Sequence, residues 1–208
     1  MQRRTTLFVA VCSMIGMMTG CAVKDARIDS FVEPTYQVGD IKSVAIFPVQ
    51  NASIAPNAAN KINISIVRAM QTKSPNVELI SPAEASRRIN DAGIVSQWRM
   101  FIEDFSTAGL VNKRYLEAIA KALGTDAVMQ GFIGRISQKD GMRPGDGIGI
   151  TRVSVSYAII DLRNAKIIWQ SNATGRYQTG SFGFHVAPEV SETIDVALKK
   201  LTDNMPSL

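Results

Sequence analysis

The chain has 208 residues, of which 46% are hydrophobic and 20% are charged, and its net charge is +5. This length fits one ordinary domain with enough apolar residues to bury a core. The charge excess is small and no run of Lys and Arg gathers on one face, which argues against nucleic-acid binding. One histidine and two cysteines are too few for a zinc site, a Cys nucleophile or a His-assisted triad.

The first twenty residues have the layout of a secretory signal. Arg3 and Arg4 form a positive head, residues 7–18 form an apolar run, and Thr19-Gly20 supplies small residues at its end. An apolar run of about a dozen residues is shorter than the roughly 20 needed to cross a bilayer. We therefore predict that residues 1–20 are a signal peptide and not a membrane span.

The tetrapeptide Met18-Thr19-Gly20-Cys21 resembles a bacterial lipobox. The resemblance implies a diacylglycerol on the thiol of Cys21, cleavage before this residue and acylation of the new N-terminus. Two or more acyl chains anchor a protein stably to a membrane. Ala22, in place of an aspartate, resembles an outer-membrane address, so we expect a lipid anchor at the periplasmic face of the outer membrane. The alternative is an ordinary signal peptide with a chance cysteine.

The rest of the chain divides into a tether and one domain. Residues 21–41 lack apolar periodicity and predict a short lipidated tether, and the domain covers residues 42–208. Apolar patterns of period two or 3.6 predict its elements. The expected strands are 43–49, 77–80, 126–137, 151–161 and 166–174, and the expected helices are 58–72, 82–91, about 98–105, 112–123 and 188–204.

Local signals support several of these boundaries. Ser81, with Pro82 and Glu84 after it, predicts a capping box at a helix start. Gly124 predicts a left-handed helix end, and Gly131 predicts a bulge or a close approach of a neighbour. Residues 162–165 predict a turn that joins the last two strands into an antiparallel hairpin. In residues 151–161, Val153 and its alternate neighbours are apolar while Arg152, Ser154 and Ser156 are polar, as in a sheet with one wetter face.

The element order predicts a single α/β domain, three-layer-like, with a mixed and largely antiparallel sheet covered by helices. It resembles a superfamily of bacterial envelope proteins that includes the N-terminal domain of TolB, CsgG, LpoB and PelC. The residues that carry the resemblance are VAIFPV (44–49), LGTDAVMQG (123–131) and AIIDLRNAKIIW (158–169). Two pairs of membrane-inserting strands, as in the CsgG pore, cannot be placed, and the Pro-rich tether expected of LpoB is absent.

Candidate contact residues lie in the aromatic and Gly-containing segment 177–184. Tyr177, Phe182 and Phe184 are our candidates for a partner or subunit contact, and the alternative is a loop tucked over the sheet edge.

The glycine-rich residues 141–149 favour a connector over a phosphate-binding loop, because a strand follows them and no Lys stands at their end. Trp98 and Phe101 have the spacing of core residues, with an exposed partner patch as the alternative. His185 has no other metal-ligand type nearby.

From these observations we expect no catalytic residues, no cofactor, no metal and no small-molecule substrate. The resemblance implies a lipoprotein that acts as a non-catalytic assembly or accessory component of an envelope or export system, with ring formation as one form of that role. The alternative is a monomeric adaptor that binds and activates a periplasmic enzyme such as a peptidoglycan synthase. Either role requires a protein partner or self-association in addition to the membrane anchor.

Overall fold

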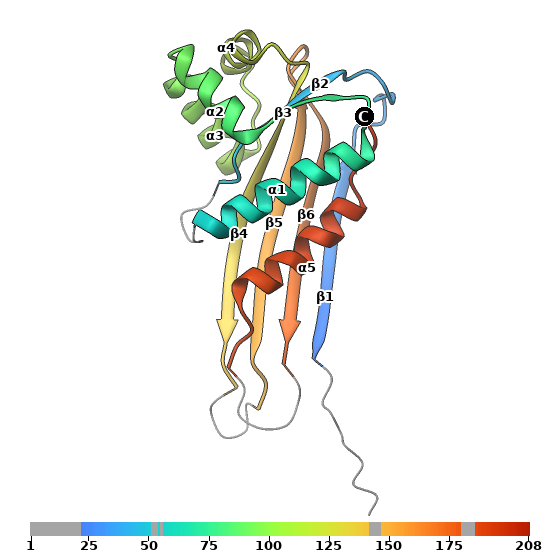
Figure 1. Ribbon diagram of the computed structural model, residues 1–208, viewed down its shortest axis with the longest axis vertical. Coiled ribbons are helices and arrows are strands. Elements are labelled where there is room, and N and C mark those ends of the chain that lie inside the picture. Colours follow the sequence, from blue (N-terminus) through green and yellow to red (C-terminus); the bar gives the residue numbers. More distant parts are fainter. Residues whose placement is uncertain (1–21, 51–53, 55, 142–146, 180–185) are drawn as a thin grey trace, which may run out of the picture.

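The computed structural model describes residues 22–50, 54, 56–141, 147–179 and 186–208. Its centre is a six-stranded sheet in the order β1-β6-β5-β4-β2-β3 (Figure 1). The strands are β1 (Val23–Val32), β2 (Ser43–Ile46), β3 (Glu78–Ile80), β4 (Ala127–Lys139), β5 (Ile150–Asp161) and β6 (Lys166–Gln178). The helices are α1 (Pro56–Lys73), α2 (Pro82–Asp91), α3 (Val95–Ala108), α4 (Lys113–Leu123) and α5 (Val190–Asp203).

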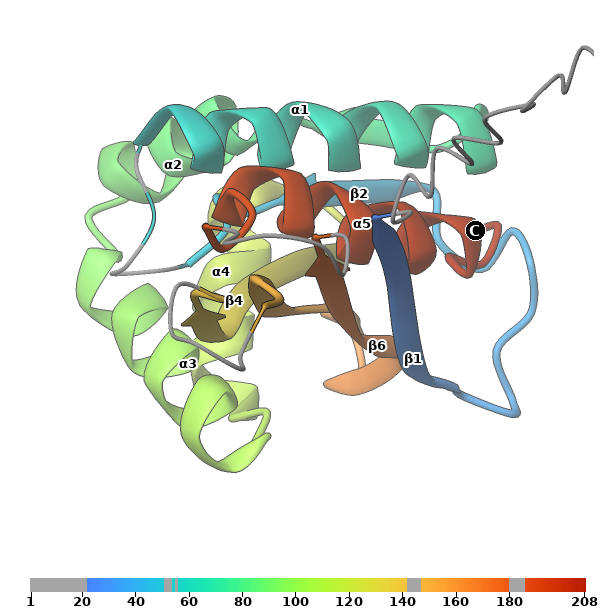
Figure 2. The same ribbon diagram turned by 90° about the horizontal axis from the view of Figure 1, so that it is seen from below.

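The sheet is the middle of three layers. Helices α1 and α5 lie on one face, and α2, α3 and α4 gather on the other face at one end of the strands (Figures 1 and 2). Each face has its own apolar cluster, one with Ile66 and Leu198 and the other with Phe101 and Leu116. Strand β2 is parallel to β3 and β4, while the pairs β4–β5, β5–β6 and β1–β6 are antiparallel. The predicted mixed, largely antiparallel sheet covered by helices is confirmed.

The prediction of a tether over residues 21–41 is wrong for the ten residues that form strand β1. Val23–Val32 form strand β1, which pairs with β6 from Val23 opposite Gln178 to Val32 opposite Trp169. Most of its side chains are exposed, and Ile28 is the one that packs against the apolar cluster beside α5. An edge strand of this kind is held by its backbone ladder, so it leaves little hydrophobic alternation in the sequence.

Two strand ends differ from the prediction by three residues or more. Strand β6 continues to Gln178, four residues beyond the expected end, because β1 supplies a hydrogen-bonding partner along that length. Strand β2 ends at Ile46, although the Phe47 amide still donates to the Met129 carbonyl at 2.9 Å. Pro48 has no amide hydrogen to continue the ladder, and contact with β4 resumes at the bridge between Gln50 and Phe132.

The segment LGTDAVMQG joins α4 to the sheet. Gly124 ends the helix with a left-handed φ of 66°, as predicted. The Asp126 carboxylate then accepts hydrogen bonds from the backbone amides of Lys42 at 2.8 Å and Ser43 at 3.1 Å, and the Asp126 amide donates to the Ser43 hydroxyl at 3.0 Å. These bonds fix the start of β4 beside the start of β2.

Gly131 provides the close approach that the sequence predicts. A Cβ atom at this position would lie 2.2 Å from the Tyr157 ring, which is 1% exposed on the neighbouring strand. The large ring therefore occupies the space that a side chain on β4 would need.

The predicted capping box is present only in part. The Ser81 hydroxyl accepts from the Glu84 amide at 3.4 Å. The Glu84 carboxylate is bound by Arg87 at 2.7 Å and Arg88 at 2.8 Å. These hydrogen bonds lower the pKa of Glu84 from 4.5 to about 2.

The predicted hairpin between β5 and β6 is confirmed, and Asp161 organises its turn. The nearly buried carboxylate accepts from the Arg163 guanidinium at 2.8 Å and from the Asn164 amide at 3.0 Å. Burial alone would raise the pKa of Asp161, but the hydrogen bonds and the charge of Arg163 outweigh it, so the pKa is lowered. Ala165 completes the turn with a φ of 59°.

Candidate interaction surface

Far from the helices α2, α3 and α4, one face of the sheet has no helix on it. In Figure 2, α5 covers one face of β6 and β1 and no helix lies on the opposite face. Val153 and Val155 of β5 are buried in the cluster beside α5, so the alternate residues Ser154 and Ser156 point to the uncovered side. We call this side the open face; it is formed by Asp25, Arg27, Asp29 and Phe31 of β1, Gln170, Asn172, Thr174 and Arg176 of β6, and Arg152, Ser154 and Ser156 of β5.

Cross-strand pairs of polar side chains run across the open face. The hydroxyls of Ser154 and Thr174 lie 3.1 Å apart, and the Ser156 hydroxyl donates to the Asn172 amide oxygen at 3.4 Å. Such pairs stabilise adjacent strands while leaving further donors and acceptors free for solvent or a partner. The wetter face predicted from the alternation of residues 151–161 is confirmed.

Positive charge gathers where β5 and β6 meet on the open face. Arg152 and Arg176 occupy directly opposite positions on these strands. Arg176 is hydrogen-bonded to Gln178, and its guanidinium lies 3.9 Å from the Asp25 carboxylate. Among the described residues, Arg152 and Arg27 have no carboxylate partner. Like charges placed opposite one another on a sheet are unfavourable unless an anion approaches them.

A hollow of about 350 Å³ lies where the open face meets the end of α3. Phe105 of α3 and Phe132 of β4 form part of its wall, with ring centroids 5.9 Å apart. Ser156 and Gln170 add polar groups from the open face. The open face therefore passes from a charged region near the strand ends to a partly aromatic hollow beside α3.

The predicted contact residues are only partly within the described chain. Tyr177 is described, and it lies in β6 and not in a loop. It is partly exposed, and the Lys24 ammonium of β1 sits 4.2 Å from its ring centroid. Phe182, Phe184, His185 and the lipid-site candidate Cys21 lie outside the described residues. Tyr177 alternates with Arg176 along β6, so it belongs to the face that carries α5.

The aromatic pair Trp98 and Phe101 packs inward as predicted. Phe101 is fully buried and stacks on Phe105 with ring centroids 5.9 Å apart. Trp98 is partly buried against Phe47, with ring centroids 5.8 Å apart. Neither residue contributes to the open face.

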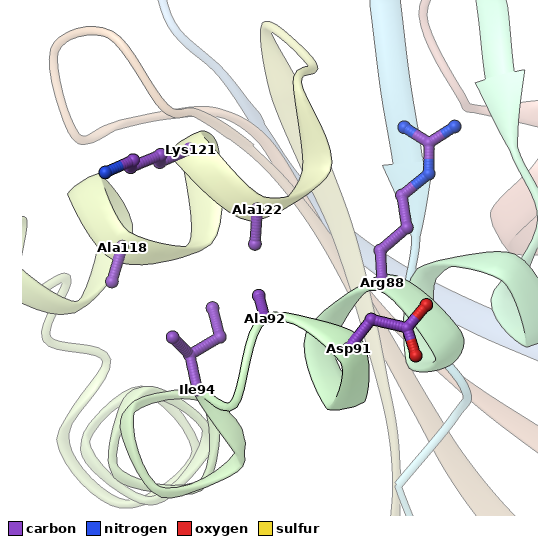
Figure 3. A pocket seen from close by; sticks show the side chains of 7 residues that line it. All are labelled: Arg88, Asp91, Ala92, Ile94, Ala118, Lys121 and Ala122. Atoms are coloured by element: carbon purple, nitrogen blue, oxygen red, sulfur yellow. The ribbon is translucent and has the colours of Figure 1, made fainter.

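A second hollow, of about 520 Å³, lies between α2 and α4. Figure 3 shows that its floor is made of alanines and Ile94, while Arg88 and Lys121 extend away from it. Arg88 is bound to Glu84 at 2.8 Å and to the Leu123 carbonyl at 2.6 Å, which ties α2 to the end of α4. The charged ends of Arg88 and Lys121 thus point away from the hollow and do not converge on it.

None of the helices in the described ranges is long and apolar enough to cross a bilayer. In that same part of the chain, no three His, Cys, Asp or Glu side chains come together in a way that could hold a metal ion.

Comparison with solved structures found proteins of similar fold. The PelC dodecamer of Paraburkholderia phytofirmans is 15% identical with a TM-score of 0.49, and the match covers 88% of this chain and 99% of that one. Lipoprotein GNA1162 of Neisseria meningitidis is 15% identical with a TM-score of 0.45, covering 78% and 99%. The LpoB C-terminal domain of Salmonella enterica is 14% identical with a TM-score of 0.40, covering 68% and 85%.

PelC and LpoB are two of the proteins that the sequence resembles. At 14–15% identity, what these proteins share with this chain is the fold. No family model matches the chain, and no curated protein matches it.

Proposed function

We propose that this chain is a lipoprotein, anchored to the outer membrane and facing the periplasm, that acts as a non-catalytic accessory component of an envelope or export system. It works through contacts with protein, and these contacts include self-association into a ring. The observation that supports this proposal most is the open face, because a polar and charged sheet surface without a covering layer is suited to contact with another protein.

The position of β1 supports the anchored arrangement. Val23 begins the strand two residues after Cys21, so a lipid on Cys21 would lie within about 7 Å of the sheet, at roughly 3.3 Å per residue. The domain would then rest close to the bilayer, with the strands rising from it. In Figure 1, helices α2, α3 and α4 lie at the opposite end of the sheet from the start of β1.

The lipid anchor is tested by mass spectrometry of the full chain purified from membranes. We expect a mature N-terminus at Cys21 that carries the mass of three acyl chains, and recovery of the protein in the outer-membrane fraction. The variant Cys21→Ser should lose the lipid and leave that fraction. Cys12→Ser, which changes the other cysteine, is the matched control and should behave as wild type. An unmodified Cys21 would refute the anchor.

The role through protein contact is tested by the mass of the lipidated chain in detergent, measured by light scattering over a range of concentrations. A discrete multimer would support the ring. A monomer that instead retains one periplasmic enzyme on a column, and raises its activity, would support the adaptor. A monomer with no protein partner after cross-linking in cells would contradict both forms of the proposed function.

A further inference from the structure

We propose that the open face of one copy of this chain binds the exposed side of α5 in a second copy. This inference rests on the proposed function and names the surfaces through which self-association occurs. Two observations support it. The two surfaces carry opposite charge, and they lie at the same position along the length of the strands.

The exposed side of α5 is acidic in its first half. Glu192 and Asp195 are exposed, and they are three positions apart, so they lie on the same side of the helix. Glu189 directly precedes the helix and is also exposed. Among the described residues, none of these three carboxylates has a basic partner. The basic residues of the helix come later, where Lys199 is already paired with Asp203 at 2.8 Å.

The open face offers the opposite charge. Arg152 and Arg176 lie opposite each other across β5 and β6, and Arg27 lies on β1. Asp25 lies 3.9 Å from the Arg176 guanidinium, and Asp29 is further along β1, so Arg152 is the member of the arginine pair without a carboxylate partner among the described residues. Carboxylates that arrive here would relieve the repulsion between the two arginines and form hydrogen bonds with guanidinium groups that have free donors.

The two charged surfaces lie at the same level of the sheet, on opposite faces. A Cβ atom added to Gly175 would lie 2.5 Å from the Thr193 carbonyl oxygen and 2.9 Å from the Ala197 amide nitrogen. Gly175 is next to Arg176 in β6, so the stretch of α5 from Thr193 to Ala197 crosses the sheet directly behind the arginines.

A contact between unlike surfaces of identical subunits is heterologous, and it gives a closed ring when successive copies are related by rotation alone. Because the acidic and basic surfaces share one level, the subunits can meet without a shift along the strands. The shared level also keeps the lipid-bearing ends of all subunits at the same distance from the membrane.

Charge reversal tests the contact in the full lipidated chain in detergent. Arg152→Glu makes the open face acidic, and Asp195→Lys makes α5 basic. Each variant alone then meets like charge with like charge, and we expect its multimer to be lost, with at least a tenfold weaker association than wild type. In an equimolar mixture each variant can pair with the other, so alternating multimers should form again, with an even number of subunits.

Two variants with the same change of charge are matched controls. Arg99→Glu on α3 and Glu117→Lys on α4 alter exposed residues far from both surfaces, and each should assemble as wild type. Circular dichroism and thermal unfolding confirm that the reversed variants remain folded.

Three results would overturn the inference. They are reversed variants that assemble as wild type, folded reversed variants whose mixture stays monomeric, and a wild-type chain that is monomeric at every concentration. The last result would still leave the lipid-anchored adaptor to be tested by partner capture, so it does not refute the proposed function as a whole. Assembly that is lost in both variants and regained in the mixture supports the contact directly.

Discussion

The two halves of strand β5 differ in how many of their side chains are buried. From Tyr157 to Asp161 every residue is buried, because helices cover both faces of the sheet there. From Thr151 to Ser156 buried residues alternate with more exposed ones, because only α5 covers the sheet. Residues 157–161 belong to the core of the domain, and residues 151–156 carry the open face. The same strands thus contribute to the core along one part of their length and form an exposed surface along the other.

The largest difference between the halves should appear in the free energy of unfolding. Phe101→Ala removes a fully buried ring from the doubly covered half and should cost about 3–5 kcal/mol. Phe31→Ala removes a 48% exposed ring from the open face and should cost less than about 1 kcal/mol. Urea unfolding measures both. Equal losses would show that the open face is not a free surface.

Gly175 tests how closely α5 packs on the half of the sheet that only this helix covers. Gly175→Ala forces a Cβ into the backbone of α5 and should cost about 1–3 kcal/mol, because the helix must move away from the sheet. Gly134→Ala is the matched control, since its Cβ would meet Ser154 at an ordinary 3.5 Å on the open side. Thermal unfolding should leave this control within about 1 kcal/mol of wild type. A harmless Gly175→Ala would contradict the packing of α5 on β6.

A smaller effect of opposite sign is expected at Tyr157, near the junction of the two halves. Its buried hydroxyl has no hydrogen-bond partner within the described chain, and burial raises the pKa of this phenol strongly. Tyr157→Phe removes the unpaired group while keeping the ring against Gly131, so it should stabilise the protein by about 1 kcal/mol. Tyr115→Phe serves as control. Destabilisation by Tyr157→Phe would reveal a partner for the hydroxyl.

The smallest effect is the acid dependence of stability that Glu84 contributes. Because the pKa of Glu84 is lowered from 4.5 to about 2 in the folded protein, its contribution is present above about pH 4.5 and is lost as pH falls toward 2. Unfolding curves of Glu84→Gln should therefore approach those of wild type as pH falls through this window. The control Glu117→Gln should keep the pH dependence of wild type. Parallel curves for Glu84→Gln would refute the prediction.

The doubly covered half was the part most readily predicted from sequence. Helix periodicity placed α2 and α4, Ser81 and Gly124 marked a start and an end, and residues 162–165 predicted the hairpin. These signals are local, because caps and turns depend on a few neighbouring residues. Strand β1 was missed, because its pairing partner lies far along the chain, where Val23 pairs with Gln178.

The candidate surface was predicted only in outline. The alternation of Val153 with Arg152 and Ser154 indicated a wetter face of one strand, but not which helices would leave it uncovered. The aromatic segment 177–184 predicted a contact at a different place, and Tyr177 lies on the opposite face of the sheet. The predicted turn fixes the register of the hairpin near Asp161, but a register shift between Ile159 and Ile160 places Arg152 opposite Arg176, and nothing in the local sequence indicates that shift.

The sequence by itself determined the elements whose signals are short-ranged: the apolar faces of the helices, the helix ends, the hairpin and the lipobox-like start of the chain. Only the tertiary structure decided that β1 joins the sheet, that α2, α3 and α4 cover one end of a face and leave the rest open, and that the acidic part of α5 lies directly behind the arginines. The physical reason is that hydrophobic periodicity records whether a residue is buried, whereas strand order and register record which distant segments bury it.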